Sequence, residues 1–171
     1  MSQPYAIQTP LTDDSIRTLR AGDEVLLSGT VYAARDQAHK RLCALIEAGQ
    51  PLPFDLAGQV IYYVGPTPAR PGRIIGAAGP TTASRMDAFT PPLLACGLKG
   101  TIGKGIRNPQ VRQALIHYRA VHFAALGGAG ALLSQYITAH TFVALEDLGA
   151  EALRRLEFKA LPLIVAFDAF G

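Results

Sequence analysis

The chain alternates short β-rich runs with helical stretches, and this alternation constrains its fold more than any other feature. The run "EVLLSGTVYAA" (24–34) predicts a strand interrupted by Gly29, and "RDQAHKRLCALIEAG" (35–49) predicts a helix that Gly49 ends. We also expect a capped helical turn at 12–19, strands at 60–64 and near Ile74 and Ile75, and a helix at 81–97 that is broken at Pro91-Pro92. Residues 98–118 should form a strand, a glycine loop and a helix, and residues 119–137 a strand, a small-residue turn and a helix. Residues 140–171 should form a strand, a short helix and closing strands. This order predicts an α/β domain with a mixed or parallel sheet and flanking helices.

Composition narrows the classes of protein that fit. The 171 residues suit one domain, with residues 1–10 as an extended arm, and 49% hydrophobic residues can form a real core. A net charge of +3 without a run of basic residues argues against nucleic-acid binding. No leader and no apolar run of about 18 residues is visible, so we expect a cytoplasmic protein.

The two cysteines, Cys43 and Cys96, are expected to be structural thiols. Neither belongs to a CxxC or to a Cys/His pair at ligand spacing. Two cysteines cannot supply the three or four thiolates that an iron–sulfur cluster needs, so any such cluster would be held by another chain. The histidines at 117, 122 and 140 likewise show no metal spacing, and we expect them to be structural.

Three polar, glycine-rich loops (28–36, 76–85 and 100–107) carry isolated cations. Arg35, Arg85, Lys104 and Arg107 are each flanked by small or loop-forming residues. In α/β folds, ligands gather at such loops beyond the strand ends. Several cations of this kind suit a dicarboxylate, because arginine holds a carboxylate in a two-pronged fork and lysine acts as a point charge. The alternative is that each is a solvated surface charge. No G-x-G-x-x-G or complete P-loop is present.

The stretch "GPTTASRMD" (79–87) allows two interpretations. Thr81 and Thr82 could cap a helix, or they could face a ligand that Arg85 grips. Asp36 likewise allows two interpretations: it could cap its helix, or it could support the residues of a site. His39 is expected to lie on a helix face or to support the site, rather than to act as a base.

The motifs "GDEVLLSGTVYAARDQAHKRL", "VIYYVGP", "AAGPTTASRMD" and "IGKGIR", together with the closing segment "LEDLGAEALRRLEFKALPLIVAFD", resemble one known family. They are similar to the β subunit, or C-terminal domain, of class I iron–sulfur-dependent fumarases and L-tartrate dehydratases. The resemblance runs from about Leu11 to the end of the chain. It implies a swivelling β/β/α domain, in agreement with the alternating strands and helices.

The resemblance also implies a function. The chain would be the β subunit of a two-subunit hydro-lyase that reversibly hydrates fumarate to (S)-malate, with a [4Fe–4S] cluster on the partner α subunit and an α2β2 assembly. Arg35, Arg85 and Lys104 would bind substrate carboxylates, and Thr81 would abstract the proton. Four residues would support them: Asp36, His39, Thr82 as the helix cap, and Asp87 as an orienter of Arg85. Two alternatives remain open, an L-tartrate dehydratase β subunit and a non-catalytic anion-binding module.

Overall fold

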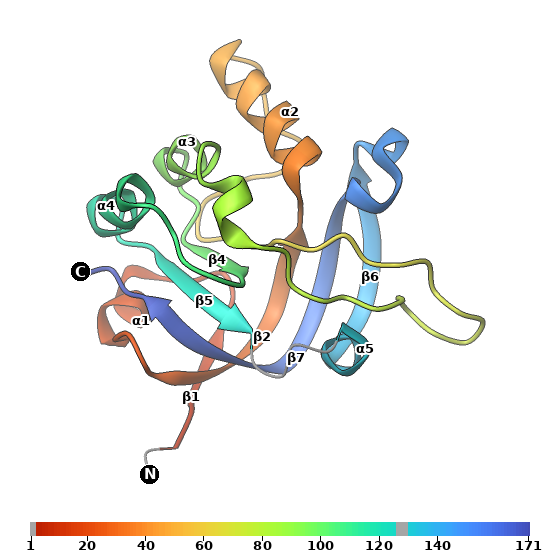
Figure 1. The fold of residues 1–171 in the computed structure, drawn as a ribbon, viewed down its shortest axis with the longest axis horizontal. Helices are drawn as coiled ribbons and strands as arrows, with labels where there is room; N and C mark the ends of the chain where they lie inside the picture. Colours follow the sequence, from red (N-terminus) through yellow and green to blue (C-terminus); the bar gives the residue numbers. More distant parts are fainter. Residues whose placement is uncertain (1–2, 126–129) are drawn as a thin grey trace.

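A computed structural model describes residues 3–125 and 130–171, and its central feature is a mixed sheet that curls into a ring (Figure 1). The described strands run in the order β1-β2-β3-β4-β5-β7-β6. Their bounds are β1 (Tyr5–Gln8), β2 (Glu24–Ala33), β3 (Val60–Tyr62), β4 (Gly100–Gly103), β5 (Val121–Ala125), β6 (Ile137–Ala144) and β7 (Leu153–Phe167). Strands β1 to β5 are parallel, and β7 is antiparallel to β2, β5 and β6. Because β7 pairs with both β2 and β5, the strands β2, β3, β4, β5 and β7 form a closed ring.

The helices cover the outside of this ring. Figure 1 shows α2 (Asp36–Glu47), α3 (Thr90–Ala95) and α4 (Pro109–His117) together on one side, with α1 (Asp13–Thr18) lower down near β1. Shorter elements complete the chain: η1 (Ala83–Met86), α5 (Gly130–Leu133), η2 (Ser134–Tyr136) and η3 (Glu146–Glu151). None of the described helices is long and apolar enough to cross a membrane.

Two buried apolar clusters hold the sheet and the helices together. The first cluster includes Leu27, Val60, Ile102, Phe123 and Leu163, one from each strand of the ring. The second packs helix side chains against the other face of the strands, and it includes Leu42, Ile61, Leu93, Val111 and Leu115. Burial on both faces explains why the parallel strands lack a simple alternation of apolar and polar residues.

The predicted mixed sheet with flanking helices is confirmed, but several local predictions are wrong. Ile74 and Ile75 lie in a loop, not in a strand. Pro91 and Pro92 lie in the first turn of α3, where proline's missing N–H costs nothing, so they begin this helix instead of breaking it. The closing strands are one continuous strand, β7. Of the predicted N-terminal arm, residues 5–8 are β1, and residues 1 and 2 lie outside the described part of the chain.

Gly29 is part of strand β2, so the first of the three predicted loops is mostly strand. The register of β2 against β7 shifts between Leu27 and Gly29, and Gly29 has φ +109°. A Cβ at this position would lie 2.3 Å from Thr9 Oγ1, so only glycine fits. The small-residue turn predicted at 126–129 falls outside the described residues; the helix that follows it, α5, is present.

Candidate active site

Three of the expected site residues lie at the carboxyl end of adjacent parallel strands. Arg35 follows β2 and Lys104 follows β4. Thr81 is held between the ends of β3 and β4: its N–H donates to the Tyr63 carbonyl (2.7 Å), and its own carbonyl accepts from the Lys104 N–H (3.1 Å). This is the edge of an α/β sheet where ligands usually bind.

Asp36 brings the fourth residue, Arg85, to the same place. Arg85 Nη2 donates to Asp36 Oδ2, and Arg35 Nη2 lies 3.9 Å from the same oxygen. The N-cap position of α2 is Arg35, so Asp36 lies inside the helix and does not cap it. Its carboxylate is therefore a counter-ion that holds two guanidinium groups near one another. A carboxylate of a ligand has the same charge and geometry, and could bind the same two groups.

The side chain of Arg35 packs against Gly65. A Cβ on Gly65 would lie 2.8 Å from Arg35 Cδ and 2.9 Å from Arg35 Nη1, so the absence of a side chain creates the space for this guanidinium. Arg35 Nε is buried and has no hydrogen-bond partner among the described residues.

His39 supports Arg35 from the next turn of α2. Its Nδ1–H donates to the Arg35 carbonyl at 2.8 Å, and the ring is fully buried. Burial lowers the pKa of His39 to about 4, so the ring is neutral near pH 7. A neutral ring with one fixed donor can hold the backbone of Arg35 in place.

Thr82 occupies the N-cap position of η1, but its side chain makes no capping hydrogen bond, so the predicted cap is wrong. Backbone contacts hold this segment instead: Thr82 pairs with Lys104 in a parallel bridge, and the Ala83 N–H donates to the Lys104 carbonyl (2.8 Å). Gly103 permits this approach, since a Cβ there would lie 3.2 Å from the Thr81 carbonyl oxygen and still closer to Tyr63.

Arg107 was expected among the loop cations, as a ligand contact or a solvated charge, and both expectations are wrong because it is buried. Its side chain is 0% exposed and donates from Nε to Asp87 Oδ1 (2.7 Å). It also donates from Nη1 to the Tyr63 hydroxyl (2.9 Å) and from Nη2 to Thr90 Oγ1 (2.7 Å). We call these residues, with Thr101 and His122, the Arg107 cluster. Asp87 therefore holds Arg107, and the expectation that it orients Arg85 is wrong.

The Arg107 cluster connects two of the segments that carry the expected site residues. Asp87 also accepts from the Asn108 N–H (3.0 Å), so it fastens the loop after Lys104 to the segment after Arg85. The pKa of His122 is well below its usual value, because the ring is buried and lies beside the Arg107 charge, so this ring is neutral. No short sequence pattern separates such a buried arginine from a solvated one.

The cysteines do not form a metal site. Cys43 Sγ donates to the Phe89 carbonyl (3.5 Å), and burial raises its pKa to about 11, so the thiol is protonated at neutral pH. Cys96 is exposed. Over residues 3–125 and 130–171, no group of three or more His, Cys, Asp or Glu side chains could hold a metal ion. These residues do not fit an iron–sulfur cluster.

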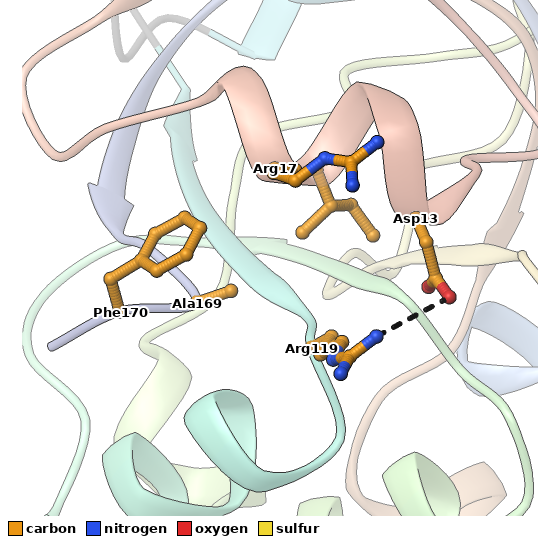
Figure 2. A pocket seen from close by; sticks show the side chains of 6 residues that line it. Asp13, Arg17, Arg119, Ala169 and Phe170 are labelled. Atoms are coloured by element: carbon orange, nitrogen blue, oxygen red, sulfur yellow. Dashed lines mark ion pairs between the residues drawn. The ribbon is translucent and has the colours of Figure 1, made fainter.

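A separate hollow of about 250 Å³ lies between α1 and the C-terminal residues (Figure 2). Asp13, Arg17, Arg119 and Phe170 line it, and Arg119 Nη1 lies 4.0 Å from Asp13 Oδ2. None of the expected site residues lines this hollow. Its charged groups already have ion-pair partners, Asp13 with Arg119 and Arg17 with Asp14, so it is a poor candidate for the binding of a dianion.

Comparison with known proteins gives a consistent result. The family model described as "Fumarase C-terminus" matches residues 3–171. The chain is 37% identical to fumarate hydratase 1, mitochondrial, of Leishmania major over 85% of this chain, and 36% identical to the anaerobic class I fumarate hydratase of Escherichia coli over the same share. It spans only 27% of the length of each of these two enzymes. It is also 31% identical to the L(+)-tartrate dehydratase subunit beta of Escherichia coli, over 96% of this chain and 83% of the relative.

Proposed function

The chain belongs to the fumarase C-terminus family, and on this premise we propose that it is the β subunit of a two-subunit hydro-lyase acting on a dicarboxylate, with fumarate and (S)-malate as its substrate pair. The observation that carries this proposal is the arrangement at the ends of β2, β3 and β4. Asp36 holds Arg35 and Arg85 together there, and the backbone of Thr81 is bonded to that of Lys104.

The cations bind and orient the substrate. Arg85 and Arg35 form charge-assisted hydrogen bonds to a substrate carboxylate, which replaces Asp36 as the partner of Arg85. Lys104 supplies a further positive charge. Thr81 in its alkoxide form removes the proton from the carbon next to a carboxylate and so becomes a neutral hydroxyl. A hydroxyl is a weak base, so this role requires the nearby positive charges and a site from which water is excluded.

A partner subunit completes the site. The side chain of Arg85 is 50% exposed and Lys104 is exposed, so these residues form an open surface. Water can be excluded only when a second surface closes over them. Two comparisons support such a partner. One relative is named as a beta subunit, and this chain spans only 27% of the length of the fumarate hydratase. We infer that the partner carries the [4Fe–4S] cluster, because the described residues of this chain do not fit one.

Replacement of Arg85 by alanine in the assembled enzyme tests this proposal. Loss of a desolvated charged contact costs about 2–5 kcal/mol, so we expect kcat/KM for malate to fall roughly 30- to 5,000-fold while the iron content and the cluster spectrum stay unchanged. Arg70→Ala, in the exposed segment 67–74, is the matched control and should keep normal turnover. Near-normal activity of the Arg85 variant would refute the assignment.

The second candidate is an L-tartrate dehydratase. The beta subunit of the Escherichia coli enzyme matches this chain over most of both lengths, which favours this alternative more than general family membership does. The same cations suit both substrates, because each substrate is a dicarboxylate. Steady-state kinetics of the reconstituted two-subunit enzyme on malate and on L-tartrate distinguishes the two, with the higher kcat/KM identifying the substrate.

A further inference from the structure

A cavity of about 530 Å³ lies between the loop after β3 and the elements β6 and η3. It contains a buried arginine, Arg154, that has no counter-ion among the residues the structure describes. Its volume is within the range of small-molecule sites, about 300–1,000 Å³. Pro66, Pro68, Ile75 and Phe142 contribute apolar walls, and Arg154 contributes the charge. Figure 1 shows this loop, in yellow to yellow-green, projecting on the side of β6.

Arg154 is only 8% exposed, yet its charge is not paired. Its Nη1 contacts His140 Nε2 (3.3 Å), and its Nη2 donates to the Gly149 carbonyl (3.1 Å). Its Nε is buried and has no hydrogen-bond partner among the described residues. No ion pair joins this guanidinium to a carboxylate in the described part of the chain. A buried cation without an anion is unfavourable, so this one requires an explanation.

The groups around Arg154 do not neutralise it. His140 has a lowered pKa because of burial and the Arg154 charge, so it is a neutral acceptor. Glu146 lines the same cavity but makes no ion pair with Arg154. Phe142, directly opposite Arg154 in the register of β6 and β7, lies with its ring 4.8 Å from the guanidinium carbon. Arg154 is therefore packed on an aromatic ring and still has donors to offer.

The walls of the cavity favour a ligand that also has an apolar part. Ile74 is 48% exposed and Phe142 is 46% exposed, and both line the hollow. Exposed apolar side chains that gather around one charged group indicate a ligand with both characters. We propose that this cavity binds a small organic acid, with its carboxylate on Arg154 and its apolar body against Ile74, Ile75 and Phe142.

This site is distinct from the cationic surface at Arg35 and Arg85. Neither Arg35 nor Arg85 lines the cavity, although Arg35 and the Ala150 carbonyl both lie close to Gly65. Ala150 also lines the cavity. The proposal does not depend on the chain being part of a hydro-lyase.

An NMR titration of the full chain with hexanoate tests the proposal, with hexan-1-ol as the uncharged probe of the same length. Hexanoate should give saturable shifts at the amides around Phe142 and Ile75, and hexanol should bind about tenfold more weakly or worse, because a hydrogen bond to a charged group is lost. Arg154→Met should weaken the binding of hexanoate about tenfold or more, as the loss of the carboxylate does in hexanol. Arg155→Met is the matched control, since Arg155 is the exposed neighbour that contacts Glu157, and it should bind normally.

Three results would overturn the proposal. Equal binding of hexanoate and hexanol would show that the charge of Arg154 is not used, and this comparison needs only the wild-type chain. Unchanged hexanoate binding by a folded Arg154→Met variant would show the same. Shifts confined to Arg85 and Lys104, abolished by Arg85→Met, would place the acid at the proposed substrate site instead.

Discussion

The buried pair of Asp87 and Arg107 gives the sharpest test of how this site is built. Asp87→Ala removes the only carboxylate that pairs with Arg107 in the described residues, and it leaves a guanidinium that is 0% exposed without a counter-ion. Breaking a buried pair from one side costs about 3–5 kcal/mol. For a chain of this length, about 2–4 °C of Tm is lost per kcal/mol, which predicts a fall of roughly 6–20 °C.

A double variant separates the charge effect from loss of packing. The hydroxyl groups that accept from Arg107 have other partners: Tyr63 and Thr90 bond to each other (3.1 Å), and Thr90 donates to the Met86 carbonyl (2.8 Å). The Asn108 N–H loses its acceptor in both Asp87→Ala and Asp87→Ala/Arg107→Met, so the double variant differs from the single one mainly in lacking the uncompensated charge. We expect the double variant to be more stable than Asp87→Ala alone.

Urea and thermal unfolding followed by circular dichroism measure both variants. Asp14→Ala is the matched control, because Asp14 pairs with Arg17 at the surface and its loss should change Tm far less. If the double variant were as unstable as Asp87→Ala or less stable, the destabilisation would come from lost packing and hydrogen bonds. The argument from an uncompensated buried charge would then be wrong.

Three further predictions concern the site itself. Gly65→Ala should displace the Arg35 guanidinium and raise KM for the dicarboxylate, with a smaller change in kcat, in steady-state assays of the assembled enzyme; an unchanged KM would show that Arg35 does not bind substrate. Thr81→Ser should keep measurable turnover and Thr81→Val should lose it, whereas similar rates would exclude the hydroxyl from proton transfer. Folding lowers the pKa of His39 from 6.5 to about 4 and also lowers that of His122, so between these pH values the unfolded chain binds more protons than the folded one. The free energy of unfolding should therefore decrease as the pH falls from 6.5 to 4, by about 3 kcal/mol for His39 alone. His39→Leu should make the free energy of unfolding, measured with urea, less dependent on pH over that range.

The sequence predicted the fold where local signals are strong. Helix α2 ends at Glu47, just before Gly49, and the helix predicted within 98–118 is α4 with Asn108 as its N-cap, because caps and breakers act over a few residues. The strand predicted near Ile74 failed because apolar residues in a loop can line a cavity as well as a sheet. Sequence spacing cannot distinguish these two surroundings.

The site was predicted as a set of cations, and its internal pairing was not. The sequence indicated Arg35, Arg85 and Lys104 as cations of three separate loops, and their position near one sheet edge is known only from the structure. Which carboxylate faces which guanidinium depends on contacts between distant segments, as for Asp36 with Arg85 and Asp87 with Arg107. Local sequence carries no information on such partners, and for this reason Asp87 was assigned to the nearer arginine.

Closure of the ring by β7 has a mechanical consequence for the site. A strand at an open edge can slip in register or fray, but β2, β3 and β4 each have neighbours on both sides. The residues at their carboxyl ends therefore cannot drift apart without breaking the ring. The backbone at Arg35, Thr81 and Lys104 is held in one arrangement, and adjustment to a bound molecule is left to side chains such as the half-exposed Arg85.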